Sequence, residues 1–140
     1  MRLLILTALL AVTVSACSGD ADTPTAPSAN VPFSTVDVRV GTGAEATNGR
    51  PVSVNYALFH YSASAPDNKG GAIQAGPFSF TVGSTQAIAG FSQATLGMRV
   101  GGLRRAIVPP NLAYGNNPPA GSGIAPNETL VFEIELLAVQ

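Results

Sequence analysis

The sequence predicts an α+β fold in which a small antiparallel β-sheet packs against one short α-helix. Two segments, Pro51–Tyr61 and residues 130–137, alternate their side chains with a period of two, as half-buried strands do. Residues 90–98 are the helix candidate, and their few apolar side chains support only about two turns before Gly97. A helix this short needs a sheet to pack on.

Further strands are indicated by short runs that alternate in polarity and end at glycine or proline: 36–40, 77–82 and Leu103–Val108. Pro109 and Pro110 must end the last run, because proline has no N–H to donate to a strand ladder. The strand at 130–137 has the clearest alternation, so we expect it to be central in the sheet and to close the chain.

Three segments are expected to lie outside regular structure or to surround a pocket. Residues 62–76 are rich in turn-forming residues and predict a surface loop or bulge. Residues 116–127 contain several prolines and glycines and have the length of a functional or disordered loop. Small residues between Gly83 and Gly90 allow a close backbone approach, which is typical of a pocket floor.

The N-terminus carries the signals of export. Residues 1–16 combine Arg2 with an apolar stretch too short to span a bilayer comfortably, which indicates a signal peptide. Small residues before Cys17 resemble a bacterial lipobox, where cleavage precedes a lipidated thiol; the alternative is an ordinary secretory signal with an incidental cysteine. Residues 17–32 then form a flexible tether and 33–140 the folded domain. Ser18 suggests outer-membrane sorting, and hence the periplasmic face, if the cell has an outer membrane.

Composition narrows the function. The 140 residues carry 11% charged and 46% hydrophobic side chains and a net charge of −1, which gives no support for nucleic-acid binding. His60 is the only histidine and Cys17 the only cysteine, so neither a metal cluster nor a catalytic triad is expected. We therefore expect no cofactor and assign His60 a structural or surface role.

Four ordered motifs carry a family resemblance: AIAGF at 87–91, LGMRVGG at 96–102, IVPPNLAYG at 107–115 and LVFEIEL at 130–136. Together they resemble the FKBP-type peptidyl-prolyl cis-trans isomerases, over residues 36–139. The resemblance implies an FKBP-like fold, in which a curved antiparallel sheet wraps around one short helix. It also implies an enzyme that acts on proline-containing polypeptides. Together with the export signals, it leads us to expect that the enzyme assists the folding of extracytoplasmic proteins, and we expect a monomer. Binding of macrolide inhibitors is left open.

The resemblance also implies the site residues. An apolar pocket is expected from Tyr56, Phe78, Ile88, Phe91, Tyr114 and Phe132, although Tyr56, Phe78 and Phe132 can also be read as ordinary core. The Ile88 N–H and the Tyr114 hydroxyl are expected to donate hydrogen bonds to ligand carbonyls. Further substrate contacts are assigned to Ile73, Gln74, Gln86, Ala87 and Ile124.

One departure from the family pattern bears on turnover. Residues 72–76 replace the family segment that supplies a wall phenylalanine and a carboxylate, leaving Ile73 as the apolar wall and Gln74 in place of the acid. The isomerase reading needs no acid or metal, because a dry pocket favours the twisted amide over the resonance-stabilised planar one. The alternative is a proline-peptide-binding or chaperone module with weak or no turnover.

Overall fold

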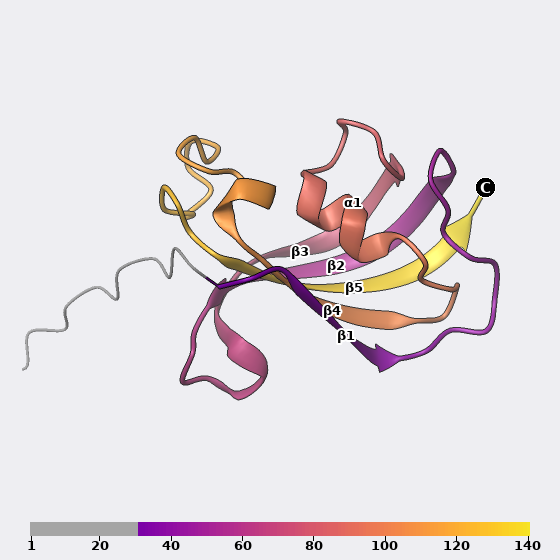
Figure 1. Ribbon diagram of the computed structural model, residues 1–140, viewed down its shortest axis with the longest axis horizontal. Coiled ribbons are helices and arrows are strands. Elements are labelled where there is room, and N and C mark those ends of the chain that lie inside the picture. Colours follow the sequence, from indigo (N-terminus) through magenta and orange to yellow (C-terminus); the bar gives the residue numbers. More distant parts are fainter. Residues whose placement is uncertain (1–30) are drawn as a thin grey trace, which may run out of the picture.

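The computed structural model describes residues 31–140, which form a β-sheet with a short helix on one face (Figure 1). The elements are β1 (Ser34–Arg39), β2 (Pro51–Tyr61), β3 (Lys69–Thr81), α1 (Ala89–Thr95), β4 (Leu103–Val108) and β5 (Leu130–Val139), with 3-10 turns η1 (Pro66–Asn68) and η2 (Pro110–Leu112). The predicted α+β fold is confirmed. The predicted signal peptide, Cys17 and the tether up to residue 30 lie outside the described residues.

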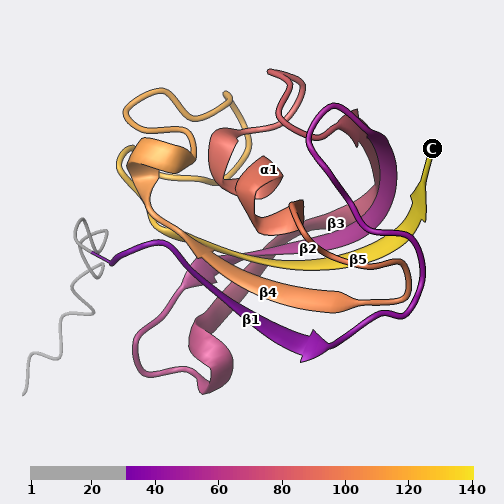
Figure 2. The ribbon, with the colours of Figure 1, turned by 45° about the vertical axis from the view of Figure 1, so that its right-hand side comes forward.

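The sheet is antiparallel throughout, in the order β1-β4-β5-β2-β3. The predicted central position of the last strand is confirmed, because β5 pairs with both β2 and β4. Directly opposite residues of an antiparallel ladder share a face, so Val54 of β2 and Leu136 of β5 point to the same side, where both are buried. Figure 2 shows the sheet curving around α1, which gives this side its concave shape.

Of the loop or bulge expected over residues 62–76, the loop is wrong for the second half, where the β2–β3 ladder instead has the register shifts of a bulged strand. Residues 69–76 belong to β3, which pairs with β2 from Lys69 to Thr81. The glycine and alanine residues in this stretch give no alternating pattern that would predict a strand. The strand forms nevertheless, because its backbone pairs with that of β2. Pro77 is tolerated inside the strand because β3 is an edge of the sheet, where a missing N–H need not break a second ladder. Only the connection at 62–68 lies outside the strands.

Helix α1 is held close to the sheet by a small residue and by a cation. A Cβ placed on Gly90 would lie 2.2 Å from Cγ1 of Val108 on β4, so only glycine allows this approach. At the other end, Nη1 of Arg104 donates to the carbonyl oxygens of Ala94 and Leu96, both at 3.0 Å. A guanidinium at this position satisfies carbonyls that a helix leaves free at its C-terminus.

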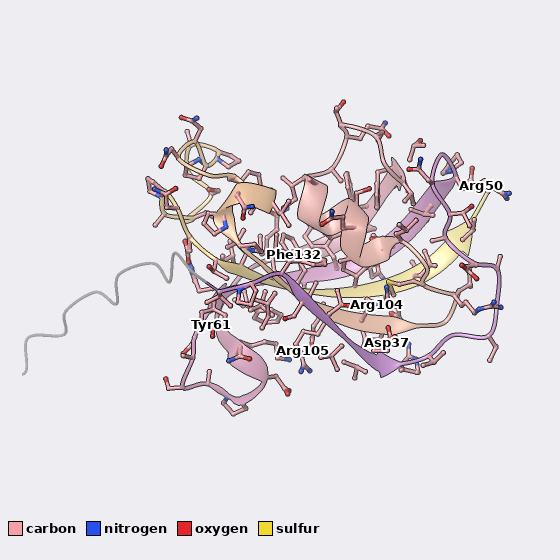
Figure 3. The ribbon with its side chains drawn as sticks, viewed as in Figure 1. Asp37, Arg50, Tyr61, Arg104, Arg105 and Phe132 are labelled. Carbon is pink, nitrogen blue, oxygen red and sulfur yellow. The ribbon has the colours of Figure 1, made fainter. Side chains whose placement is uncertain are left out.

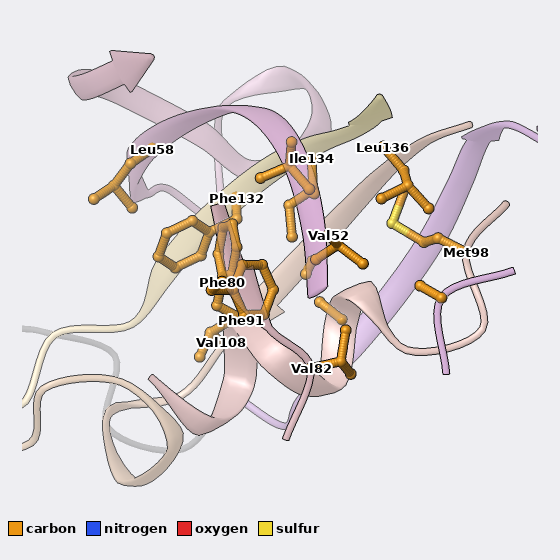
Figure 4. Close-up of a cluster of buried hydrophobic side chains, with 14 of the residues drawn as sticks. Val52, Leu58, Phe80, Val82, Phe91, Met98, Val108, Phe132, Ile134 and Leu136 are labelled. Carbon is orange, nitrogen blue, oxygen red and sulfur yellow. The ribbon is translucent and has the colours of Figure 1, made fainter. Parts of the chain in front are cut away.

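The hydrophobic core lies between α1 and the concave face of the sheet. Figure 4 shows the rings of Phe80, Phe91 and Phe132 at its centre, with Met98 and Leu136 toward one end. Phe91 of α1 is 3% exposed, and Ile134 and Leu136 of β5 are completely buried. Burial of each large apolar side chain contributes roughly 1.5–3 kcal/mol relative to exposure. The short helix is therefore stabilised by packing on the sheet, as the sequence predicts.

The opposite face of the sheet carries a network of ion pairs. Glu133 of β5 accepts from Nζ of Lys69 at 2.9 Å and from Nη2 of Arg105 at 3.2 Å, while Nη1 of Arg105 lies 2.8 Å from Oδ1 of Asp67. Asp67 belongs to η1, so these contacts hold the 62–68 connection under the sheet, near the labelled Arg105 in Figure 3. In the part of the chain from 31 onward, no helix is long and apolar enough to cross a membrane.

We expect Gly90→Ala to destabilise the domain by about 1–3 kcal/mol, the usual cost of overpacking a close contact. The added methyl group would force α1 away from Val108 of β4. Urea unfolding followed by circular dichroism measures the change in the free energy of unfolding. Gly71→Ala is the matched control, because a Cβ there meets only Cδ2 of His60, at an ordinary 3.5 Å. Equal stability of the two variants would contradict the close-approach argument.

Candidate active site

A cavity of about 390 Å³ opens between the concave face of the sheet, the start of α1 and the segment that leads into α1. Strands, helix and loops all contribute to its lining: Tyr56, Leu58, Gln74, Phe78, Thr85, Gln86, Ala87, Ile88, Phe91, Tyr114 and Phe132. The six residues that the sequence assigned to an apolar pocket are all in this set. They come from five separate segments of the chain, which the fold brings together.

Strand register places the side chains on the wall formed by the sheet. Leu58 of β2 lies opposite Gln74 of β3 on one side and opposite Phe132 of β5 on the other, so all three point to the concave face. Tyr56 is two residues before Leu58 and shares that face. Its partner on β3 is Gly76, which has no side chain to cover the tyrosine ring. The tyrosine is therefore free to face the cavity.

The floor of the cavity is a cluster of aromatic rings centred on Phe91. Its ring centroid lies 5.7 Å from that of Tyr56, 5.9 Å from that of Phe78 and 5.2 Å from that of Phe132. The three interplanar angles are 84°, 70° and 77°, the edge-to-face arrangement that aromatic quadrupoles prefer. Such pairs contribute about 0.5–1.5 kcal/mol each beyond their burial. The floor is thus rigid as well as apolar.

The rim at residues 84–88 is tied down by its own polar groups. Oε1 of Gln86 accepts from the Thr81 N–H at 2.9 Å and from the Ser84 hydroxyl at 3.1 Å. Ile88 follows as the residue before α1, and its carbonyl accepts the Ser92 N–H at 3.1 Å. Within residues 31–140, by contrast, no hydrogen bond uses the Ile88 N–H. A preformed backbone donor is therefore available at the edge of the cavity.

Tyr114 lies just after η2 and supplies a second free donor. Its side chain is half-buried against the core, and its hydroxyl has no hydrogen-bond acceptor among residues 31–140. Burial raises the pKa of Tyr114 above its ordinary value of 10.0, and the nearby Tyr56 phenol raises it further by charge repulsion. The hydroxyl therefore stays protonated at neutral pH, and it can donate a hydrogen bond to an acceptor that enters the cavity.

The loop at 116–127 is closed at its base next to Tyr114. The Asn127 N–H donates to the Gly115 carbonyl at 2.7 Å, and the Ala125 N–H donates to Oε2 of Glu128 at 2.6 Å. The other carboxylate oxygen of Glu128 contacts Nδ1 of His60 at the end of β2. His60 therefore has the structural role that the sequence predicts: it connects the β2–β3 hairpin to this loop.

The remaining sequence assignments divide into two groups. Gln74, Gln86 and Ala87 line the cavity, whereas Ile73 and Ile124 pack against the core and are outside the lining set. Ile73 has no partner in the β2–β3 register, because it lies at the shift between Gln74 and Ala72, and its side chain packs against the core instead of lining the cavity. Leu58 and Thr85 line the cavity but were missed as site residues. Leu58 could have been found from its two-residue spacing to Tyr56, while Thr85 gives no such signal.

The chemistry of the cavity is set by its lack of charge. Among the described residues that line it, the side chains are aromatic, aliphatic, hydroxyl or amide, and none is ionised at neutral pH. The described residues also contain no group of three or more His, Cys, Asp or Glu side chains that could hold a metal ion. What the site offers is an uncharged hollow with an aromatic floor, where the Ile88 N–H and the Tyr114 hydroxyl are available donors alongside the hydroxyl and amide side chains of the lining. This suits a neutral, partly apolar ligand with carbonyl oxygens.

Comparison with known families decides the assignment. The model of the FKBP-type peptidyl-prolyl cis-trans isomerases matches residues 43–137, which is well over half of the chain. This chain belongs to that family. The match includes every residue that lines the cavity, and the resemblance noted in the sequence is confirmed. The chain is accordingly an FKBP-type isomerase, an enzyme that interconverts the cis and trans forms of X-Pro peptide bonds.

Relatives in several kingdoms share the isomerase domain. An FK506-binding protein of Streptomyces anulatus is 40% identical over 107 residues, covering 74% of this chain and 82% of the relative. FK506-binding protein 4 of Neurospora crassa is 42% identical over 105 residues, but the match spans only 21% of its length. The chloroplastic peptidyl-prolyl cis-trans isomerase FKBP16-4 of Arabidopsis thaliana is 38% identical, with 46% of its length covered.

Solved structures agree with the fold of this isomerase. FkpA from Escherichia coli is 31% identical with a TM-score of 0.62, covering 77% of this chain and 48% of that one. A peptidyl-prolyl cis-trans isomerase from Pseudomonas syringae is 29% identical at the same TM-score, with 77% and 75% covered. AtFKBP13 is 26% identical with a TM-score of 0.64, covering 77% and 93%. The curved antiparallel sheet around one short helix is thus the FKBP fold.

The raised pKa of Tyr114 predicts a late step in an alkaline titration. Subtracting the absorbance titration of Tyr114→Phe from that of the wild type isolates this phenol, and its midpoint should lie above 10.0. Because the folded state holds this proton more tightly than the unfolded chain, its contribution to stability is complete below pH 10 and is lost as the pH rises through the folded pKa. A midpoint at or below 10.0 would show that the phenol is neither buried nor close to Tyr56.

Proposed function

We propose that this isomerase uses the cavity around Phe91 to isomerise X-Pro bonds of extracytoplasmic polypeptides and so assists their folding. The observation that carries the proposal is the combination of an uncharged aromatic floor with two unused donors, the Ile88 N–H and the Tyr114 hydroxyl. Uncatalysed X-Pro isomerisation takes tens to hundreds of seconds, which is slow enough to limit folding. An enzyme that shortens this step would act on chains newly delivered outside the cytoplasm.

The proposed mechanism follows from what twisting does to an amide. The planar amide is stabilised by resonance, and rotation has a barrier of about 18–20 kcal/mol. Water stabilises the planar, more polar form, so transfer into a dry pocket lowers the barrier. The pyrrolidine ring would pack on Phe91 between Tyr56, Phe78 and Phe132. The Ile88 N–H and the Tyr114 hydroxyl would each donate to a carbonyl of the polypeptide and hold the chain while the bond rotates.

The amide side chains at the cavity mouth set the proposed ligand class. Gln74 stands where the family has a carboxylate, and Gln86 is turned back onto the Ser84 hydroxyl and Thr81 N–H. Without an ionised group, the mouth gives no electrostatic preference for charged residues beside the proline. We propose that proline-containing polypeptides are the substrates. Macrolides of the FK506 type, which the names of the relatives record, would have to bind with Gln74 in place of the acid.

Loss of the Tyr114 hydroxyl should slow catalysis while leaving the fold intact. Removal of a preorganised donor costs from about threefold, for an ordinary hydrogen bond, to about 100-fold where the donor acts only on the twisted amide. We expect kcat/KM of Tyr114→Phe to fall within this range in a proline-peptide isomerisation assay on the domain from residue 32 onward. The matched control is Tyr61→Phe, since Tyr61 lies at the end of β2 and does not line the cavity.

A second outcome would favour the weaker alternative of a binding or chaperone module. If wild-type protein binds proline peptides but does not accelerate their isomerisation, the cavity serves recognition alone. Turnover that is equal in the wild type and in Tyr114→Phe would instead remove the hydroxyl from the mechanism. A decrease in Tyr61→Phe as large as that in Tyr114→Phe would indicate a general structural effect.

We also propose that the domain is a monomer held at the cell envelope through a lipidated Cys17. The support is the short apolar stretch before a lone cysteine, followed by a tether of small polar residues and prolines. Several acyl chains on one cysteine give stable anchoring, whereas a single chain is marginal. Ser18 is compatible with outer-membrane sorting, which would place the domain on the periplasmic face. The tether would let the cavity reach polypeptides away from the lipid surface.

Lipid anchoring predicts a change in partitioning that depends on one sulfur atom. Full-length chain produced in a lipoprotein-processing bacterium should enter the detergent phase in Triton X-114 extraction, and Cys17→Ser should move to the aqueous phase. The physical reason is the loss of the only thiol that can carry acyl chains. Ser28→Ala, which keeps the thiol, is the control and should partition like the wild type. A wild-type chain that already partitions into the aqueous phase would favour an ordinary secretory signal, and a Cys17→Ser chain that stays in the detergent phase would contradict anchoring through Cys17.

A further inference from the structure

A second hollow of about 470 Å³ lies beside the active-site cavity, between α1 and the segment that leads from β3 into α1. One wall is the side of α1 that carries Ala89, Ser92 and Gln93, continued by Leu96 just after the helix. These residues are spaced at i, i+3, i+4 and i+7, so they form one continuous stripe along α1. The facing wall is the chain from Val82 to Ala87, and Asn48 borders one side.

One hydrogen bond joins the two walls of this second hollow: the Gly83 N–H donates to the Ser92 hydroxyl at 2.6 Å. Within the facing segment, a turn is closed by the Ser84 N–H, which donates to the Thr81 carbonyl at 3.0 Å. Ser92 is 7% exposed, so this contact is shielded from water. The hollow is consequently formed before any ligand arrives. A preformed site binds more tightly, because little ordering remains to be done on binding.

The lining of the second hollow determines what it can hold. Among the described residues that line it, none is charged, and half are glycine, alanine or serine: Gly83, Ser84, Ala87, Ala89 and Ser92. Leu96 lies at the end of the helix and is 46% exposed, which leaves a large aliphatic side chain without cover. The amides of Asn48 and Gln93 supply polar groups at the edge. This chemistry fits an aliphatic or aromatic side chain on a neutral stretch of polypeptide.

The two hollows adjoin each other. Thr85 and Ala87 line both of them, so the 85–87 segment forms a ridge on the boundary between the two linings. An extended chain advances about 3.3 Å per residue, so a few residues suffice to cross one segment of backbone. A polypeptide held in the first hollow by its proline would reach the second by crossing the 85–87 ridge.

We propose that the second hollow is a subsite that binds an apolar side chain of the same polypeptide, a few residues from the isomerised proline. The proposal rests on the proposed function of the first cavity, because the proline held there sets the position of the chain. It adds a selectivity for sequence around the proline. Polypeptides with leucine or an aromatic residue at the right distance are bound more tightly than those with glycine. Exposed apolar residues of this kind are characteristic of unfolded chains.

The test uses labelled peptides that share one alanine-proline core and carry leucine or glycine at positions two to four residues before or after the proline. Fluorescence anisotropy gives the dissociation constant of each peptide for the domain, and the isomerisation assay gives kcat/KM. For each position, the dissociation constant of the glycine peptide is divided by that of the leucine peptide, and kcat/KM of the leucine peptide by that of the glycine peptide. We expect a ratio of about tenfold at one position, which corresponds to about 1.4 kcal/mol.

Two substitutions at Leu96 test the location of the subsite. Leu96→Ala shortens the wall of the second hollow and should reduce the leucine-to-glycine ratio to about threefold. Leu96→Glu places a charge in that wall and should reduce the ratio to about one. The matched control is Leu137→Glu, because Leu137 of β5 is 45% exposed and lies outside both hollows. That variant should keep the full tenfold ratio.

Each result separates the subsite from the rest of the function. A ratio near one at every position in the wild type would overturn the subsite, and so would a ratio that survives Leu96→Glu. A wild-type domain that dimerises in sedimentation experiments and becomes monomeric in Leu96→Glu would assign the hollow to a second copy of the chain. Failure of the proposed function is seen independently: a short peptide that contains only the alanine-proline sequence, and cannot reach the second hollow, would then show no catalysed isomerisation.

Discussion

The packing of Phe91 against three strands is the interaction on which the rest of this structure depends. Its ring meets Tyr56 and Phe80 from the β2–β3 hairpin and Phe132 from β5, and the next residue toward the N-terminus is the glycine that allows this depth. A helix of seven residues has little stability of its own. Its position is therefore determined by one aromatic side chain inserted into the concave face of the sheet.

The same contact creates the active site. Because the ring of Phe91 fills the space between sheet and helix only at the helix start, the neighbouring Tyr56 and Phe78 stay partly exposed on the side of the cavity. Core and site are thus one continuous aromatic cluster, and Phe132 belongs to both, with 3% exposure and a place in the cavity lining. Substitutions that weaken the packing of this cluster would reduce both stability and catalysis, whereas a substitution of Tyr114 should reduce catalysis alone.

Much of the fold could be predicted from the sequence because the central strands alternate cleanly. Val52 and Val54 in β2 and Ile134 and Leu136 in β5 mark the buried face without ambiguity. The site was predicted by a different route, since Tyr56, Phe91 and Tyr114 lie far apart in the chain and were linked by the family resemblance. The first half of β3 was missed because its small residues carry no alternation and its hydrogen bonds come from β2. Thr85 was missed because a loop residue enters a cavity through backbone geometry alone.

The position of β1 at the edge of the sheet has a mechanical consequence. Within residues 31–140 this strand has a backbone ladder with β4 alone, reinforced by the Arg104–Asp37 ion pair and, across to β5, by the Arg39–Glu135 ion pair. A pull on the chain before residue 33 would load that single ladder first. The cavity is built from β2, β3, β5, α1 and the turn at Tyr114, so peeling β1 away would leave its walls in place. Tension applied from the N-terminal side should therefore separate β1 from β4 before it disturbs the active-site cavity.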